Sequence, residues 1–452
     1  MEERGGRSRP YVVRVQSNMN EARAAKYLAG AASVVVTPDE PTWMAGLAAR
    51  KAPSRGKIHD LHAKALALQD EQGGRLVIVT MDLIAVTPHI ASTVAAEIER
   101  RHGVPRERIL FSASHTHFGP EVRPDKAEFF GIPEEFAAKI EPYVAKLIRK
   151  LIDVIDRAIG NLEPAQLTAR ETSATFALNR RKQRGGVDHG VDHHVPVLDV
   201  TGPDGSRVAV VFGYACHCTV LEPNDCRFCG DWAGFAQEYV EREFPGATAM
   251  FITGAAADQH ADPRYKVEHS ENYGRQLADA VQGSLAGDTP GRPISGGMQV
   301  AYEDVPLPFD RIPTRQELQA NLAGDDEPLK TKSRYLLRRM DEGHTFPTTY
   351  PCPLQVVRFG DEMLLVAIGG EPVVDYAHMM GEAFAGPVVW VAGYCNDMFA
   401  YVPTKAVLQE GGYEGGRSVL WSYLPAPFTG ETEDRVMSAA RKLVKQVQGE
   451  SR

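Results

Sequence analysis

The sequence lacks a long apolar run and a long basic run, and each absence excludes a class of protein. No window reaches the roughly 18 consecutive apolar residues that a membrane-spanning helix needs. The net charge is −9, from 50 Lys and Arg against 59 Asp and Glu, which argues against nucleic acid as the main partner. The first sixteen residues contain no apolar segment of the kind found in secretory signals, so we expect a cytoplasmic protein.

Cysteine is scarce, and the few cysteines are clustered. Of the six in the chain, four lie within fourteen residues, at Cys216, Cys218, Cys226 and Cys229. Such clustering indicates metal or local redox chemistry rather than a dispersed disulfide framework. A structural zinc site on these four cysteines is one alternative, although their spacing matches no standard zinc finger.

Internal repeats, low-complexity tracts and a clean linker are also missing. The 452 residues are 43% apolar and 24% charged, the ordinary range of a globular protein. Strand-like and helix-like segments alternate, but hairpins interrupt the β-α-β rhythm. The predicted fold class is therefore α/β (mixed α+β), with mixed β-sheets flanked by helices and a metal site at the C-terminal ends of strands. We expect an N-terminal arm over residues 1–26 and one catalytic domain over 27–452, with an insertion at 305–350.

Hydrophobic periodicity locates the elements of this fold. The predicted strands are 31–38, 62–68, 75–82, 108–113, 165–178, 195–200, 207–212, 247–253, 298–305, 354–359, 362–368 and 387–391. The predicted helices are 90–101, 134–159, 231–244, 271–285, 315–323, 330–340, 371–384 and 433–448.

Five of the strand-like runs end in polar side chains. The first ends at His115 and His117; side chains two residues apart in an extended chain point the same way, so this pair suits a metal or a proton relay. The second run ends at His217, and the third is followed by Asp258 and His260. Each group alone has an ordinary explanation as an exposed loop residue or a turn.

The last two runs add a carboxylate and a phenol. Glu371 follows two glycines and is expected to open a helix, where a first-turn glutamate is favoured by the helix dipole. Tyr401 follows the run that begins at Trp390, and a core tyrosine is its ordinary explanation. Together, two histidines, a glutamate and a tyrosine or aspartate at the ends of buried strands supply the ligands that a catalytic zinc needs. Zinc lowers the pKa of bound water to about 7 and yields a hydroxide nucleophile.

These segments resemble the catalytic domain of the neutral (alkaline, non-lysosomal) ceramidases from about Gly30 to about Tyr423. The block Ser114-His115-Thr116-His117-x-Gly119-Pro120 is the most specific, with Phe118 where the family has serine. The other matching segments are Asn179-Arg180, the His217 segment with Gly230-Asp231, the Gly-Glu371 turn, Cys395-Asn396 with Tyr401, and Gly412-Tyr413-Glu414-Gly415.

The resemblance implies a zinc-dependent hydrolase that cleaves an amide bond by attack of zinc-bound hydroxide. One Zn²⁺ would be held by His115, His217, Glu371 and Tyr401. The amide carbonyl, and the negative charge that grows on it, would be held by His117, Arg180 and Tyr413. We also expect Asn179, Asp258 and His260 to contact substrate.

Three features depart from the family pattern. Ala257-Asp258-Gln259-His260 stands where the family has Gly-Asp-Val-Ser-Pro, and we expect neither the family's C-terminal β-sandwich nor a secretion signal. We therefore expect another N-acyl or cyclic amide in place of ceramide.

The expected partner is a small-molecule N-acyl amide or a lipid-like substrate, in lipid metabolism, with no nucleic acid and no transmembrane segment. A homo-oligomer is left open. Two alternatives stay open as well: a zinc esterase or lactonase on a small soluble substrate, and a non-enzymatic protein with structural zinc on the cysteine cluster.

Overall fold

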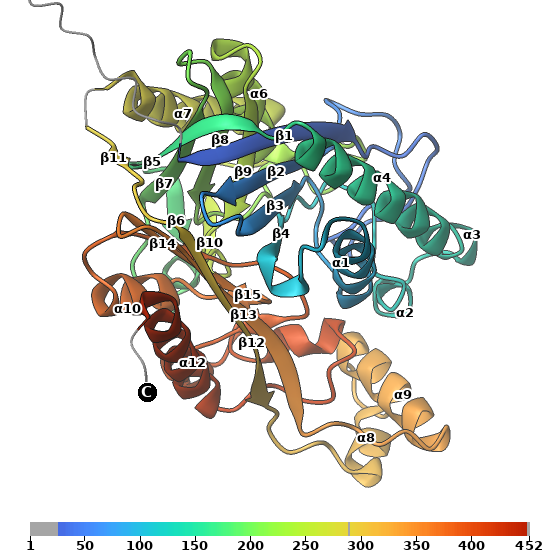
Figure 1. Cartoon of the computed structure of the whole chain (residues 1–452). Coiled ribbons are helices and arrows are strands. Elements are labelled where there is room, and N and C mark those ends of the chain that lie inside the picture. Colours follow the sequence, from blue (N-terminus) through green and yellow to red (C-terminus); the bar gives the residue numbers. More distant parts are fainter. Residues whose placement is uncertain (1–25, 288–289, 450–452) are drawn as a thin grey trace, which may run out of the picture.

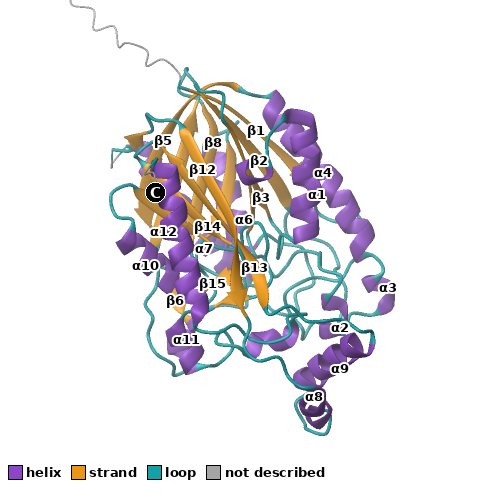
Figure 2. Ribbon diagram, turned by 60° about the horizontal axis from the view of Figure 1, so that its bottom comes forward, coloured by secondary structure: helices purple, strands orange, loops and turns teal. Residues whose placement is uncertain are grey.

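The computed structural model describes residues 26–287 and 290–449, which fold into four stacked layers. Two β-sheets lie face to face in the middle, and helices cover the outer face of each (Figures 1 and 2). This is the mixed α/β class that the sequence predicts. The predicted N-terminal arm over residues 1–26 lies outside the described residues, apart from Lys26.

The larger sheet is built from nine of the described strands. These are β1 (Tyr27–Val35), β2 (His62–Asp70), β3 (Arg75–Met81), β4 (Ile109–Ala113), β5 (Glu163–Ser173), β7 (His194–Thr201), β8 (Arg207–Tyr214), β9 (Thr248–Thr253) and β11 (Arg292–Pro293). Their order is β4-β3-β2-β1-β5-β7-β8-β9, with β11 beside β5. β3 and β4 are parallel, as are β8 and β9, and the other neighbours are antiparallel.

Both faces of the larger sheet are buried, which explains the continuous apolar runs of its strands. In β2, Ala63 and Ala65 face the outer helices, whereas Leu66 and Leu68 face the second sheet. Successive side chains of a strand point to opposite faces, so each run contributes to two cores at once.

Four long helices cover the outer face of the larger sheet: α1 (Pro88–His102), α4 (Ile140–Gly160), α6 (Asp231–Glu243) and α7 (Val267–Ala286). The helix predicted over 134–159 is broken into α3 (Glu134–Ala137) and α4. Pro142 has no amide hydrogen for a continuous helix, and it fits the first turn of a new one. Within the described ranges, no helix offers the apolar length that a bilayer crossing requires.

The second sheet consists of β12 (Met298–Pro308), β13 (Thr349–Phe359), β14 (Met363–Ile368) and β16 (Val388–Ala392), in that order. β12, β13 and β14 are antiparallel neighbours, and β16 is parallel to β14. α10 (Asp375–Ala383) and α12 (Glu431–Gln448) cover its outer face. Between β12 and β13 the chain forms α8 (Arg315–Asn321) and α9 (Glu327–Asp341), at the lower right of Figure 1.

Three β-α-β units recur in this architecture: β3-α1-β4, β8-α6-β9 and β14-α10-β16. The two strands of each unit run in the same direction, so their C-terminal ends lie at the same edge of a sheet. His115 follows β4, His217 follows β8 and Glu371 follows β14. Each unit therefore delivers one of the polar groups that the sequence singles out.

Short elements connect these units, and the hydrophobic pattern did not predict most of them. They are η1 (Arg106–Arg108), α2 (Lys126–Phe130), β6 (Ala177–Asn179), α5 (Arg180–Gln183), β10 (Gln259–Ala261), β15 (Glu371–Pro372), β17 (Tyr401–Val402), α11 (Lys405–Glu410) and η2 (Arg417–Trp421). The prediction that a helix starts at Glu371 is wrong, because β15 comes first and α10 begins at Asp375. β15 pairs in parallel with β17, which sets Glu371 opposite Tyr401.

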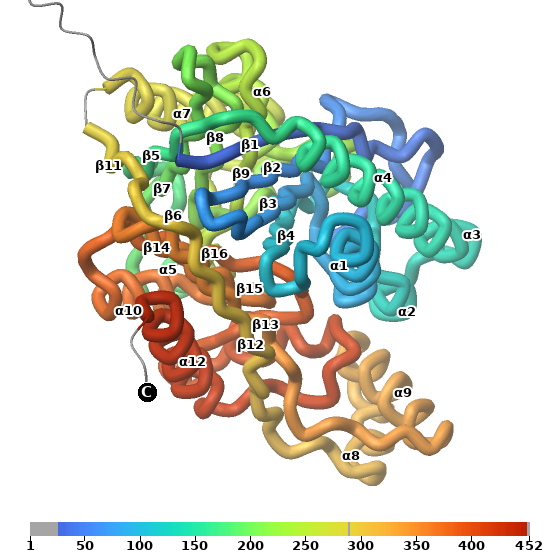
Figure 3. Tube along the Cα trace, in the orientation of Figure 1, coloured from blue at the N-terminus to red at the C-terminus, as the bar shows by residue number. Residues whose placement is uncertain are grey.

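Hydrogen bonds fasten the C-terminal ends of strands from both sheets to one another. Thr253 Oγ1 donates to the carbonyl of Ala113 at 2.9 Å. The amide of Gly393 donates to the Thr253 carbonyl at 2.9 Å, and the amide of Ala113 to the Tyr394 carbonyl at 3.3 Å. The Tyr394 amide donates to Gly370 at 2.9 Å. The ends of β4, β9, β14 and β16 thus meet in the middle of the molecule (Figure 3).

Replacing Thr253 by valine tests the contribution of this fastening. Thr253→Val should lower the free energy of unfolding by about 1–3 kcal/mol, because the buried Ala113 carbonyl loses the Thr253 hydroxyl. Urea denaturation measures the change. Thr248→Val at the start of the same strand is the matched control and should change stability by less than about 0.5 kcal/mol. Equal effects at the two positions would contradict the assignment.

Candidate metal centre

Two imidazoles and a carboxylate converge where the strand ends meet. His115 Nε2 lies 3.5 Å from Glu371 Oε2, and His217 Nε2 lies 3.4 Å from the same oxygen. The two imidazole rings are 5.0 Å apart, centroid to centroid. All three side chains are buried.

Hydrogen bonds on the far side of each ring fix the tautomers. His115 Nδ1 lies 2.8 Å from the carbonyl oxygen of Ile84, and His217 Nδ1 lies 2.7 Å from that of Ala256. A carbonyl only accepts, so each Nδ1 carries the hydrogen and each Nε2 presents a lone pair to the centre. Metal-ligating histidines are oriented in this way. His217 Nε2 is buried and has no hydrogen-bond partner among the described residues.

These distances fit a tetrahedral zinc ion. Zinc binds nitrogen and oxygen at about 2.0–2.2 Å, so two ligands of one tetrahedral ion are about 3.4 Å apart. The two imidazole-to-carboxylate separations match that value. Burial holds the pKa of His115 and of His217 at about 3, so both rings are neutral and able to bind a cation.

The backbone reaches this arrangement differently from the prediction. β4 ends at Ala113, and His115 has a left-handed φ of 58°. The predicted extended chain through His117 is therefore wrong. The two rings still come within 4.8 Å, centroid to centroid, because the left-handed residue turns the chain at His115.

His117 adds a third imidazole to the cluster. His115, His117 and His217 each offer a ring nitrogen within 4.8 Å of the others. Both ring nitrogens of His117 are buried and have no hydrogen-bond partner in the described chain. Burial first, and then the neighbouring His115, hold the pKa of His117 well below its ordinary value.

Two tyrosines lie beside the carboxylate. Tyr401 is opposite Glu371 in the β15–β17 pair, and its hydroxyl accepts a hydrogen bond from Arg180 Nη2 at 3.0 Å. Sequence reasoning missed Tyr394, whose ring is 4.5 Å from that of His115 and whose hydroxyl is 3.5 Å from Glu371 Oε2. Burial raises the pKa of both phenols. A left-handed φ of 57° at Tyr394 marks the turn that brings it here, and the sequence carries no signal for it.

Arg180 is held in place by ion pairing. Its Nε donates to Glu414 Oε1 at 2.7 Å, and Glu414 Oε2 also accepts from Arg181 Nη1 at 2.9 Å. Burial opposes the charge, but Tyr401 and Glu414 raise the pKa of Arg180 and keep it cationic. Tyr413 is 37% exposed at the rim, and its ring lies 5.4 Å from that of Tyr401.

The three residues predicted to contact substrate lie behind the site. Asn179 Nδ2 donates to Asp258 Oδ2 at 3.0 Å, and the Arg180 amide donates to the Asp258 carbonyl at 2.8 Å. His260 Nε2 is 2.5 Å from Gln183 Oε1. None of Asn179, Asp258 and His260 lines the cavity beside the histidines. Their substrate contact stays a prediction, and the contacts seen here position Arg180.

The cysteine cluster does not form a metal site in the described residues. All six cysteines are free and buried. Among the described residues, the group of three side chains close enough to share a metal consists of His115, His117 and His217. Cys216 and Cys229 contact other groups instead: a backbone carbonyl for Cys216 and the His59 ring for Cys229. The structural-zinc alternative thus lacks its geometry.

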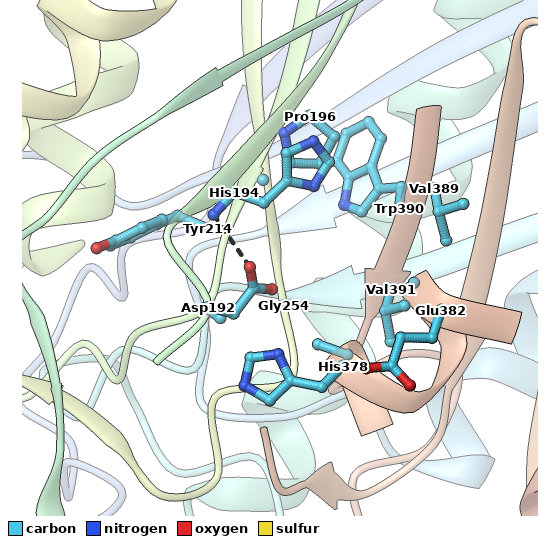
Figure 4. A pocket seen from close by; sticks show the side chains of 14 residues that line it. Asp192, His194, Pro196, Tyr214, Gly254, His378, Glu382, Val389, Trp390 and Val391 are labelled. Carbon is cyan, nitrogen blue, oxygen red and sulfur yellow. Dashed lines mark hydrogen bonds between the residues drawn. The ribbon is translucent and has the colours of Figure 1, made fainter. Parts of the chain in front are cut away.

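Two cavities are lined by both imidazoles and carboxylates. The one beside the histidines has a volume of about 70 Å³, and Arg123, Lys126, Tyr413 and Trp421 are among the residues that line it. A cavity of about 340 Å³ lies between the two sheets, lined by Asp192, His194, His378, Glu382 and Trp390, among others (Figure 4). It shares no lining residue with the first, and its acids and imidazoles do not gather into a ligand group. The smaller cavity, in contrast, is lined by His115, His117 and Glu371.

Comparison with known proteins identifies the family. The family model described as neutral/alkaline non-lysosomal ceramidase, N-terminal, matches residues 27–277, more than half of the chain. The chain belongs to the neutral/alkaline non-lysosomal ceramidase family.

Individual relatives are distant. A neutral ceramidase of Mycobacterium tuberculosis (strain ATCC 25618 / H37Rv) is 24% identical over 450 residues, covering 80% of this chain and 69% of the relative. A neutral ceramidase of Drosophila melanogaster is 20% identical over 224 residues, covering 48% of this chain. The match spans only 32% of the length of the Drosophila protein.

Solved structures share the fold. The neutral ceramidase of Pseudomonas aeruginosa superposes with a TM-score of 0.73 at 18% identity, covering 94% of this chain and 75% of the other. A ceramidase complexed with C2 gives a TM-score of 0.70 at 17% identity, covering 93% and 76%.

The neutral state of the buried imidazoles predicts an acid-sensitive fold. His115 and His217 take up a proton near pH 6.5 when unfolded but not above about pH 3 when folded. The unfolded state therefore binds more protons as the pH falls, and stability falls with it. From pH 7 to pH 5 each histidine should remove about 2 kcal/mol of unfolding free energy from the metal-free chain.

Urea unfolding at the two pH values measures this loss. The double variant His115→Gln/His217→Gln should lose less stability than the wild type over the same pH range. An equal pH dependence in the two proteins would contradict the buried neutral imidazoles.

Proposed function

We propose that this chain is a zinc-dependent hydrolase that cleaves an amide bond. The observation that carries the proposal is that His115 Nε2 and His217 Nε2 both lie within 3.5 Å of Glu371 Oε2. Tyr401 is proposed as the fourth ligand because it pairs with Glu371 across β15 and β17. Membership of the neutral/alkaline ceramidase family supports the choice of an amide.

Other residues of the chain would hold the substrate and transfer a proton. When bound, zinc would supply a Lewis acid that polarises a carbonyl and lowers the pKa of a water molecule. Arg180 keeps its charge and, with Tyr413 at the rim, would hold the amide oxygen and stabilise the negative charge that develops on it. His117 has both ring nitrogens free and would carry a proton to the leaving amine.

We further propose that residues 27–452 act as one catalytic unit in which the 305–350 insertion helps to close the cavity. α9 lies in that segment and contacts α2 and η2, whose residues line the cavity. A volume of about 70 Å³ is small beside the 300–1,000 Å³ typical of pockets for drug-sized ligands. A compact amide therefore fits this site better than a long-chain lipid.

Metal analysis tests the proposal directly. The purified wild type should hold about one zinc per chain and hydrolyse an amide, and His115→Ala should lose the metal and at least about 100-fold of activity. His102→Ala is the matched control, because His102 pairs with Asp156 in a different part of the fold. Full activity in a chelated, zinc-free sample would refute the proposal.

Gly46 should position His117. A Cβ at Gly46 would lie 2.4 Å from His117 Nδ1, and the residue has a φ of +86°, so alanine there must displace the imidazole. Gly46→Ala should lower kcat by about 10²–10⁴-fold, the range for general acid–base catalysis, while the zinc content stays at that of the wild type. Gly56→Ala is the control: it also has a positive φ but an open surrounding. Unchanged kcat in Gly46→Ala would contradict this role of His117.

A further inference from the structure

Two cationic side chains lie in the wall of the small cavity. Arg123 and Lys126 both line it, and each is 7% exposed. They come from the segment after β4 and from the start of α2, so they follow the two histidines closely in the chain. Neither residue belongs to the set that the metal chemistry uses.

Arg123 is neutralised within the protein. Its Nε and Nη2 donate to the two carboxylate oxygens of Glu121 at 2.7 and 2.9 Å. Glu121 Oε1 also accepts from the amides of Val122 and Arg123. The pair is rigid and bidentate, so it leaves little net charge for a ligand.

Lys126 has no acid in direct contact, although Asp125, Glu121 and Glu371 act on it from farther away. Its Nζ donates to the carbonyl oxygen of Trp421 at 2.6 Å, and within the described ranges no carboxylate lies within 4.0 Å of it. An ammonium group has three donors, and this one bond uses only one of them. Burial, followed by the charge of Arg123, lowers the pKa of Lys126 to about 8, which leaves it mainly protonated at pH 7.

Lys332 holds the same loop from outside the cavity. It comes from α9, and its Nζ donates to the carbonyls of Ser422 and Leu424. It does not line the cavity. Two buried lysines thus hold one loop through its backbone carbonyls. A buried cation with no acid in direct contact is costly, and an anion that enters the cavity reduces that cost for the lysine it reaches.

We propose that the substrate is a compact amide that carries a carboxylate, and that Lys126 binds this carboxylate while the amide bond lies over the histidines. This inference rests on the proposed amide hydrolase and narrows its substrate class. Ceramide has no such group. The lysine is a specificity residue: it discriminates by charge and takes no part in bond cleavage.

Matched substrates with and without the carboxylate test the inference on the zinc-loaded chain. N-acetylglycine and N-methylsuccinamate carry it on the amine half and on the acyl half, and N-acetylethanolamine and N-methylbutanamide are their neutral counterparts. For one of the two acids, the wild type should have a higher kcat/KM than for the neutral counterpart of that acid. In Lys126→Met this preference should fall by at least about 30-fold, mostly through KM, because the ammonium no longer pairs with the carboxylate.

Lys332→Met is the control for damage to the loop that both lysines hold. It should change kcat/KM for the acid and for its neutral counterpart by the same factor, so that the preference is kept. A wild type that prefers the neutral amides, or a Lys126→Met that slows both members of a pair equally, would overturn the inference.

Calorimetric binding separates this inference from the proposed activity. Should the zinc-loaded chain bind an acid in a Lys126-dependent manner yet cleave no amide, the hydrolase proposal fails and the carboxylate site stands. Should it cleave amides but neither bind nor prefer the acids, the carboxylate site fails and the hydrolase stands. Should it neither bind an acid nor cleave an amide, both fail.

Discussion

The hydrogen bonds among the ends of β4, β9, β14 and β16 are the constraint on which the site depends. The chain cannot place His115 and Glu371 together by local structure, because more than 250 residues separate them. Hydrogen bonds join Ala113, Thr253, Gly393 and Tyr394, so the ends of these strands are in direct contact. His115, His217 and Glu371 then lie only two or three residues beyond the ends of their strands.

Electrostatics then decides which groups are charged there. Burial keeps the histidines neutral, and the one carboxylate within reach of both is Glu371 among the described residues. Nearby arginines are paired with acids of their own, Arg123 with Glu121 and Arg180 with Glu414. Lys126 and Lys332 differ from them, because only carbonyl oxygens accept their hydrogen bonds. The two arginines are thus paired with acids, and the two lysines are not.

The sequence predicts the fold class and the strand-end groups because both are local properties of apolar runs. His115, His217 and Glu371 are found in this way, since each directly follows a buried strand. Tyr394 could not be predicted from the sequence, because only its left-handed backbone distinguishes it from an ordinary core tyrosine. The burial of Lys126 could not be predicted either, because α9 and the loop at Trp421, which cover it, come from far along the chain. The position of Tyr394 and the burial of Lys126 depend on tertiary contacts and not on the local sequence pattern.

The three β-α-β units have a consequence for how the protein is made. The units leave the ribosome one after another, and the proposed ligands His115, His217 and Glu371 are divided among all three. A nascent chain that ends before β15 offers two imidazoles and no carboxylate from Glu371. With the proposed ligand set, tight zinc binding would therefore wait until Glu371 is made, in about the last fifth of translation.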